Sequence, residues 1–363
     1  RAYPPPSPRA LRASPLPPSL ILNRMIDLDG SQGEGGGQIL RTSLTLSMIT
    51  GTPFRVTNIR ANRAKPGLMR QHLVAVQAAA EICGAFVSHA EVGSQSLQFR
   101  PGRIESGKYN FPIGTAGSST LVLQTLIPAL LFADKPSTVL VSGGTHNPMA
   151  PPVQFLQRAY GRVLDMMGAK VDLQLHRYGF YPRGGGEVIA SIEPCPKLQQ
   201  TELLERGALR KAYAEAIVAG IPTSIARREL QHIGDYFGWF DDQLNVIECA
   251  RDQGPGNALL ITFEHEHVTE VFTAIGGKRV QEVEVAAEVI GEAQDYQRST
   301  AAVGEHLADQ IMLPMALAGG GRFTMHRLSQ HSKTNADVIK RFLPVQIDFD
   351  EAGKHCTCRI RAA

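Results

Sequence analysis

The chain has 363 residues, of which 43% are hydrophobic and 20% are charged, and its formal net charge is +3. A chain of this length can bury a full core, and its longest apolar stretch, residues 121–133, is interrupted by polar residues and a proline, so no membrane role follows. The mildly basic balance permits an acidic or nucleic-acid partner but does not establish one.

Residues 1–24 contain seven prolines and little apolar periodicity, which predicts a disordered leader. A signal peptide is a poor fit, because no continuous apolar region precedes a small-residue cleavage site, and a cytoplasmic protein is the default expectation. Five cysteines without a regular framework fit a reducing compartment. Cys356 and Cys358, beside His355, could hold a metal, but alternate residues on a terminal strand more often simply share one face.

The first part of the patterned sequence predicts a β-α-β-α-β-β unit, because short β-rich runs alternate with longer runs of helical period. Its strands are expected at 25–28, 54–59, 86–89 and 97–100, and its helices at 37–49 and 67–83. The same order recurs with strands at 109–112, 138–141, 171–175 and 188–192, and helices at 116–132 and 152–167. A third, partial copy is expected to have helices at 302–318 and 334–342 and strands at 323–326, 345–349 and 357–360.

A segment between the second and third copies does not repeat this pattern. It predicts a strand at 212–218, a helix at 223–237, three strands ending near 272 and a helix at 280–293. An inserted domain with its own core is the simplest interpretation, and a fourth, degenerate repeat is the alternative. The expected α/β architecture is therefore a leader (1–24), a main domain (25–204 and 298–363) and an inserted small domain (205–297).

A glycine-rich segment, Gly33 to Gln38, falls between a predicted strand and a predicted helix. Backbone without side chains can bring several amides close to phosphate oxygens at the positive end of a helix. No Gly-Lys-Ser or Gly-Lys-Thr follows, and Gln38 occupies the third glycine position of the dinucleotide fingerprint, so neither known motif applies. Such a segment is a plain tight turn as often as a phosphate cradle. Glu34 and Arg41 favour the cradle, because they offer a carboxylate for a metal and a bidentate donor for a phosphate.

The next segment, from Arg60 to His72, concentrates four cations and a histidine in a loop and the start of a helix. This density could neutralise several phosphates, although a solvated basic loop is the plainer interpretation. Near the C-terminus, His306 and Gln310 are one helical turn apart on one face. Alone they would be ordinary surface groups, but His331 lies in a polar turn that leads into another helix. A neutral imidazole there could attack phosphorus, and the chain has no Lys-x-Asp-Gly motif to supply a lysine for nucleotidyl transfer.

Six blocks of this sequence resemble the RNA 3′-terminal phosphate cyclase family. They are DGSQGEGGGQILR, RANRAKPGLMRQH, GTAGSSTLVLQT, RDQGPGN, GEHLADQIMLPMALAGGG and SQHSKTNADVIKRFLP. The resemblance extends from about Met25 to the end. It implies a main domain of three repeats akin to those of enolpyruvyl transferases, with a small thioredoxin-like insert.

The resemblance also implies a chemistry. A histidine attacks the α-phosphorus of ATP and releases pyrophosphate, AMP passes to the 3′-phosphate of RNA, and the 2′-hydroxyl closes a 2′,3′-cyclic phosphodiester and expels AMP. By matching motif, His331 is the nucleophile and Glu34 binds a divalent metal, Mg or Mn. The residues implied for ATP are Gln124, Pro151, His306, Leu307, Ala308, Asp309 and Gln310, with Pro151 and His306 on opposite sides of the adenine. The residues implied for phosphate and RNA are Arg41, Arg60, Arg63, Gln71 and His72.

Two other functions stay open at this point. A non-catalytic, cyclase-like RNA-binding protein of ribosome assembly would resemble the fold, but such relatives lack the histidine that corresponds to His331. An enolpyruvyl-type transferase would share the repeat architecture and would use phosphoenolpyruvate. Some cyclase relatives have tyrosine in place of His306, although an imidazole can also stack on a base.

Overall fold

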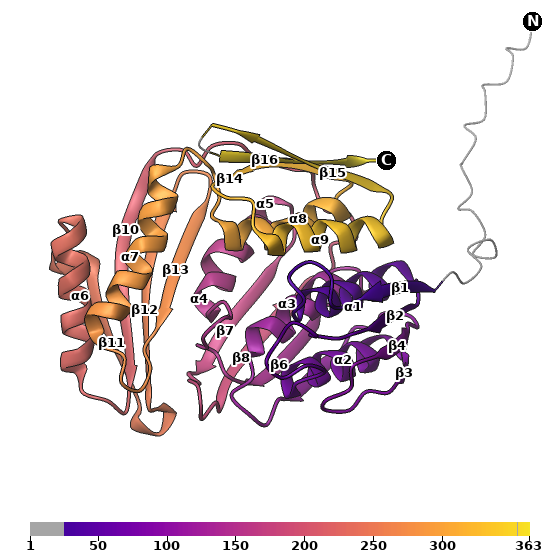
Figure 1. Cartoon of the computed structure of the whole chain (residues 1–363), viewed down its shortest axis with the longest axis horizontal. Helices are drawn as coiled ribbons and strands as arrows, with labels where there is room; N and C mark the ends of the chain where they lie inside the picture. Colours follow the sequence, from indigo (N-terminus) through magenta and orange to yellow (C-terminus); the bar gives the residue numbers. More distant parts are fainter. Residues whose placement is uncertain (1–24, 354) are drawn as a thin grey trace, which may run out of the picture.

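The computed structural model describes residues 25–353 and 355–363, so the expected leader lies outside the described residues. In this part of the chain, four four-stranded sheets pack against helices (Figure 1). The α/β class expected from the sequence is confirmed. Within the same residues, no helix combines the length and the apolar composition needed to cross a bilayer.

The first sheet has the order β1-β2-β4-β3. β2 pairs parallel with β1 and antiparallel with β4, and β4 pairs antiparallel with β3. Phe54 stands opposite Phe99 across β2 and β4, with ring centroids 5.7 Å apart, and both side chains are buried. The elements are β1 (Ile26–Asp29), α1 (Gln38–Thr50), β2 (Phe54–Thr57), α2 (Arg70–Cys83), β3 (Phe86–Ser88) and β4 (Leu97–Arg100).

The second sheet, β5-β6-β8-β7, has the same order of parallel and antiparallel pairs. The helix expected at 152–167 is present in three pieces, because a π-helical turn at Leu156–Tyr160 separates α4 from α5. The elements are β5 (Lys108–Pro112), α3 (Ser119–Leu130), β6 (Ser137–Gly143), α4 (Val153–Phe155), α5 (Gly161–Met166), β7 (Val171–Arg177) and β8 (Gly186–Ile192).

The third sheet, β9-β14-β16-β15, repeats this order once more. Its first strand, Thr201–Leu203, is absent from the sequence prediction, because Thr-Glu-Leu has one apolar residue and shows no β-rich run. The expectation had no strand here, and the division of the main domain into three repeats stays a prediction. The other elements are α8 (Glu305–Leu317), β14 (Gly320–Met325), α9 (Gln330–Phe342), β15 (Val345–Ala352) and β16 (His355–Ala362).

The segment between β9 and α8 builds a sheet of different order, β11-β10-β12-β13. Its helices cover a separate hydrophobic core that includes Phe263, Val289 and Tyr296. The expected division at 205–297 and the thioredoxin-like character of this segment stay predictions. The elements are β10 (Leu209–Ala219), α6 (Thr223–Phe237), β11 (Leu244–Cys249), β12 (Gly256–His265), β13 (Thr269–Ile275) and α7 (Glu282–Arg298).

Helices from distant parts of the chain meet in the middle of the molecule. α1 packs against α3 and α9, and α9 packs against α8, beneath the sheet of β14 to β16 in the view of Figure 1. α9 begins at Gln330, four residues earlier than expected, because the hydroxyl of Ser329 accepts a hydrogen bond from the Ser332 amide at 3.0 Å and caps the helix. His331 therefore lies in the first turn of α9, which corrects its placement in a turn before the helix.

Cys356 and Cys358 are both buried in β16 and are free thiols. Among residues 25–353 and 355–363, no group of three or more His, Cys, Asp and Glu residues is arranged to hold a metal ion. Cys356 and Cys358 are alternate residues of β16, and both are buried on the same face of that strand.

Candidate active site

The glycine-rich segment follows β1 and leads into α1. Gly33 and Gly35 have φ angles of 60° and 62°, a region that residues with side chains rarely adopt. A Cβ atom on Gly33 would stand 2.1 Å from Oγ1 of Thr334, and one on Gly37 would stand 2.6 Å from Nε2 of His72. The segment therefore needs glycine both for its backbone shape and for the close approach of α9 and α2.

Glu34 is held within this segment by three neighbours. Its backbone amide donates to Oγ1 of Thr334 at 3.0 Å, and its Oε2 accepts from the Gly36 amide at 2.8 Å. Its Oε1 forms an ion pair with the Arg63 guanidinium. The Glu34 side chain is 8% exposed, so burial and these contacts together hold the carboxylate in place.

His331 faces Glu34 from the first turn of α9. Its Nε2 lies 3.8 Å from Oε1 of Glu34, and its side chain is 46% exposed, so the ring is open to a ligand. Burial lowers the pKa of the His331 imidazole, the charges of Arg41 and Arg63 lower it further, and the charge of Glu305 acts in the opposite direction. A lowered pKa keeps the imidazole neutral at pH 7, which is the form that can act as a nucleophile.

Arg41 lies beside the buried carboxyl of Asp309. Burial lowers the pKa of Arg41 to about 10, against the charge of Asp309, so its guanidinium stays charged at pH 7. Burial likewise raises the pKa of Asp309 to about 7, against the charge of Arg41. Gln38 joins the two, since its Oε1 accepts from Arg41 at 3.0 Å and its Nε2 donates to Oδ1 of Asp309 at 3.3 Å.

Two residues that the sequence analysis did not select, Thr334 and Asn335, connect the helices of the site. Thr334 binds the Glu34 amide, as described above. The Asn335 side chain accepts from Thr42 of α1 at 2.8 Å and donates to the Asp309 carbonyl of α8 at 2.7 Å. Their positions three and four residues after His331 are the signal that could have identified them, because such residues share one helical face.

The implied phosphate-binding residues occupy different environments. His72 is buried beside Gly37, and burial, followed by the charges of Arg41 and Arg60, lowers its pKa to about 3. Its Nδ1 accepts from the Met69 amide at 3.2 Å, which leaves Nε2–H as a neutral donor. Gln71 accepts from the Ser118 amide at 2.7 Å.

Arg60 forms hydrogen bonds within its own loop. Its guanidinium donates to the carbonyls of Lys65 and Gly67 at 2.7 and 2.9 Å. Arg41 and Arg63, by contrast, lie close enough to His331 for their charges to act on it. The structure therefore brings Arg41 and Arg63 to the candidate nucleophile, while the described contacts of Arg60 are with loop carbonyls.

The residues implied for ATP lie on α8 and α3 and just before α4. Gln124 and Gln310 form a hydrogen bond between α3 and α8, and the Pro151 carbonyl accepts from Thr120 at 2.7 Å. Leu307 and Ala308 are fully buried, so their side chains belong to the core. A nucleotide could reach these two only through their backbone.

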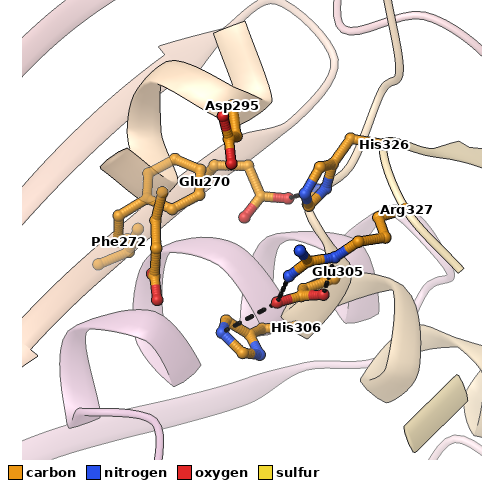
Figure 2. A pocket seen from close by; sticks show the side chains of 10 residues that line it. Glu270, Phe272, Asp295, Glu305, His306, His326 and Arg327 are labelled. Carbon is orange, nitrogen blue, oxygen red and sulfur yellow. Dashed lines mark hydrogen bonds and ion pairs between the residues drawn. The ribbon is translucent and has the colours of Figure 1, made fainter. Parts of the chain in front are cut away.

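His306 faces a pocket between α8 and the β13–α7 segment. Figure 2 shows its ring below the Glu305–Arg327 pair, with Glu270, Phe272 and Asp295 on the opposite wall. Nε2 of His306 lies 4.0 Å from Oε1 of Glu305. The pocket carries both acidic and imidazole side chains next to the helix that holds Asp309 and Gln310.

A second cleft, of about 690 Å³, lies between β1 and α9 on the other side of the glycine-rich segment. Its wall includes Gly33 and Thr334. The wall carries side chains of both charges, and two of its cations are paired with acids: Arg55 with Asp27, and Lys340 with Asp337. This mixture of charges gives no preference for a polyanion.

The fold and the site define a class of protein: a multi-sheet α/β protein whose helix-borne histidine faces a carboxylate and two arginines across a glycine-rich segment. A family model described as RNA 3′-terminal phosphate cyclase matches residues 32–349. The chain belongs to this family and is an enzyme of the ligase type.

Two curated relatives carry the same description. An RNA 3′-terminal phosphate cyclase of Ralstonia nicotianae is 58% identical over 323 residues, which cover 89% of this chain and 92% of the relative. One of Koribacter versatilis is 52% identical over 327 residues, or 90% and 92% of the two chains. Among solved structures, the enolpyruvyl transferase NikO from Streptomyces tendae matches with a TM-score of 0.33 at 12% identity, covering 93% of this chain and 48% of that one.

Proposed function

We propose that this chain is an RNA 3′-terminal phosphate cyclase that uses ATP to convert a 3′-phosphate of RNA into a 2′,3′-cyclic phosphodiester. Family membership and the names of two relatives above 50% identity support this activity. The alternative of a non-catalytic RNA-binding protein is not favoured, because the chain keeps the candidate nucleophile at position 331.

The observation that carries the proposal is the position of His331. Its Nε2 faces Glu34 at 3.8 Å, and its ring is accessible. In the proposed first step, Nε2 forms a bond to the α-phosphorus of ATP while the bond from that phosphorus to the bridging oxygen of pyrophosphate breaks. Pyrophosphate leaves, and a phosphoramidate between histidine and AMP results.

In the second and third steps, AMP is the group that moves. An oxygen of the RNA 3′-phosphate bonds to the AMP phosphorus as the phosphorus–nitrogen bond to His331 breaks. Nε2 keeps the electron pair of that bond, and the neutral imidazole is regenerated with its proton on Nδ1. The neighbouring 2′-hydroxyl then attacks the 3′-phosphorus, loses its proton and expels AMP. Little further help is needed at this stage, since the hydroxyl is already tethered beside its target.

Charge and hydrogen-bond donors near His331 support phosphate binding. Arg41 and Arg63 supply guanidinium groups, which can bind phosphate oxygens in a bidentate manner. His72 supplies a neutral N–H. Gly37, at the start of α1, has no side chain to keep a phosphate away from the backbone amides. Helix N-termini of α1 and α9 both direct amides to this region, which favours negative charge there.

The family resemblance implies a divalent metal, Mg²⁺ or Mn²⁺, and Glu34 is the residue that would hold it. One carboxylate suits such an ion when substrate phosphates supply other ligands. Both oxygens of Glu34 have partners, Arg63 and the Gly36 amide, so Arg63 has to turn from Glu34 toward a phosphate for the carboxylate to accept a metal. When bound, the metal would offset charge on the phosphates.

Labelling the protein tests the proposal. Wild type incubated with α-³²P-ATP and a divalent metal, without RNA, is expected to retain label through a bond that is labile in acid and stable in alkali. Adding RNA with a 3′-phosphate should discharge the label and produce 2′,3′-cyclic ends, whereas RNA with a 3′-hydroxyl should not.

A matched pair of histidine variants completes this test. His331→Ala should abolish labelling, and His267→Ala, at an exposed histidine of the β12–β13 turn, should not. Equal labelling of wild type and His331→Ala would contradict the proposed nucleophile. Cyclic ends without ATP would contradict the proposed reaction.

A further inference from the structure

Glu305 and Arg327 form a two-point ion pair between the start of α8 and the loop that precedes α9. Nε and one terminal nitrogen of Arg327 donate to the two carboxylate oxygens of Glu305 at 2.8 and 2.6 Å. Figure 2 shows the guanidinium and the carboxylate facing each other above His306. A bidentate pair fixes orientation as well as distance, unlike a single contact between point charges.

The two partners stand next to the residues on which the proposed reaction depends. Glu305 directly precedes His306, and Arg327 lies four residues before His331. One helical turn further along α8, the Asn335 side chain donates to the Asp309 carbonyl at 2.7 Å. Two polar contacts therefore link α8 to α9 and its preceding loop. One is the buried hydrogen bond from Asn335 to Asp309, and the other is the Glu305–Arg327 ion pair.

Exposure separates this pair from the buried contacts. Arg327 is 62% exposed, whereas Glu305 is 19% exposed. Other titratable groups lie near it on three elements: His306 on α8, His326 in the loop, and Glu292 and Asp295 on α7. Partial burial opposes ionisation of Glu305, but the hydrogen bonds and charge of Arg327 lower the pKa of its carboxyl. An ion pair at such a rim contributes little to overall stability, so its geometric effect can be measured without unfolding the protein.

We propose that the Glu305–Arg327 pair is a positioning device that holds the nucleotide-binding helix α8 in register with the nucleophile-bearing helix α9. This inference rests on the proposed function, because it assigns α8 to ATP and α9 to His331. Neither residue touches the reacting atoms. The pair sets the distance between the bound ATP and His331, and a small error in that distance lowers the reaction rate strongly.

Charge reversal and charge exchange test the inference. Glu305→Arg and Arg327→Glu should each lower the single-turnover rate constant of protein adenylylation at saturating ATP by about tenfold to hundredfold. The ATP concentration at half-maximal rate should change by less than about threefold, because the groups that would bind ATP remain. The double variant E305R/R327E should recover to within about fivefold of wild type, since the attraction is restored.

Glu202 and Arg322 provide a matched control. They form a bidentate pair of the same type, at 2.7 and 2.8 Å, between β9 and β14, with both partners exposed. Glu202→Arg and Arg322→Glu should leave adenylylation within about twofold of wild type at an unchanged melting temperature. Neutral variants, Glu305→Gln and Arg327→Gln, serve where a charge reversal prevents folding, and each should lower the same rate constant about tenfold.

The outcomes separate this inference from the proposed function. Loss in the single variants with recovery in the exchange supports the positioning role. Single variants with the wild-type rate, a loss that the exchange does not recover, or an equal loss in the Glu202–Arg322 pair would overturn it. Absence of label in wild type would instead overturn the proposed function.

Discussion

Nε2 of His331 lies 3.8 Å from Oε1 of Glu34, although one residue belongs to the last helix of the chain and the other to the loop after its first described strand. The Thr334 hydroxyl fixes this approach, because it accepts from the Glu34 amide one helical turn after His331. The same Glu34 oxygen is paired with Arg63. Carboxylate, guanidinium and imidazole therefore meet at one point, and each can be tested separately.

Glu34 and Arg63 are expected to affect the metal requirement in opposite directions. Glu34→Gln removes the carboxylate, so the Mg²⁺ concentration that gives half-maximal adenylylation should rise by about tenfold or more. Arg63→Ala frees the carboxylate, so this concentration should fall, while the maximal rate also falls through loss of a phosphate contact. A metal titration of single-turnover adenylylation measures both effects.

Asp27→Asn is the control for these two variants. Asp27 forms an ion pair with Arg55 on the same sheet, with more than half of its side chain exposed. Its replacement should leave the metal titration unchanged. A shift in the same direction for Glu34→Gln and Arg63→Ala would contradict the competition between Arg63 and a metal for one carboxylate.

Gly37→Ala should impair the site without breaking the fold. The φ angle of Gly37 is −82°, which alanine adopts freely, but the new Cβ would stand 2.6 Å from His72 and 2.7 Å from Arg41. Both side chains must move, so adenylylation should fall at least about tenfold. Gly291→Ala in α7 is the matched control, because its Cβ would meet nothing within 4 Å.

Unchanged activity of Gly37→Ala would show that the approach of His72 and Arg41 to this backbone is not required. The measurement is the single-turnover rate, accompanied by a urea unfolding curve for each variant. Gly291→Ala should be as active as wild type and slightly more stable, because alanine favours a helix interior by about 1 kcal/mol.

The sequence predicted an element well where its apolar pattern was bounded on both sides by residues that start or end a helix. The helix expected at 223–237 is α6, which follows Pro222 and ends before Gly238, a residue with a φ angle of 69°. β9 was not predicted because Thr-Glu-Leu shows no β-rich run. The start of α9 was misplaced because the Ser329 cap starts the helix in a segment of polar composition. These errors are local, and neither changes the fold class.

The sequence could not predict which site residues pair with one another. Arg63 and Glu34 come from neighbouring loops, and Asp309 meets Gln38 only because α1 and α8 pack against a common partner, α9. Such pairings follow from tertiary packing, which motif spacing does not encode. The motifs therefore identified candidates such as Arg41 and His331, while only the structure shows that Arg60 binds carbonyls of its own loop.

Glu270 should make the stability of the protein depend on pH. Its carboxyl is fully buried and accepts from the Gly304 amide at 2.6 Å, and burial raises its pKa to about 8, against this hydrogen bond and the charge of Arg206. Between its ordinary pKa and about 8, the folded state keeps a proton that the unfolded state has released. The free energy of unfolding should therefore fall as pH rises through this window, by at most about 1.4 kcal/mol per pH unit from this group.

Glu270→Gln isolates this effect. Glutamine keeps an acceptor for the Gly304 amide but cannot ionise, so the variant should gain stability relative to wild type between pH 5 and pH 8. Urea unfolding of both proteins at these two pH values measures the change. An equal stability difference at pH 5 and pH 8 would contradict a raised pKa for Glu270.

The position of the adenylate on the protein tests the central claim most directly. Wild type is incubated with ATP and Mg²⁺ in the absence of RNA, digested under alkaline conditions and mapped by tandem mass spectrometry. The account predicts one adenylylated residue, His331, in fragments that separate it from Lys333. Adenylate on Lys333, His72 or His306, with His331 unmodified, would contradict it.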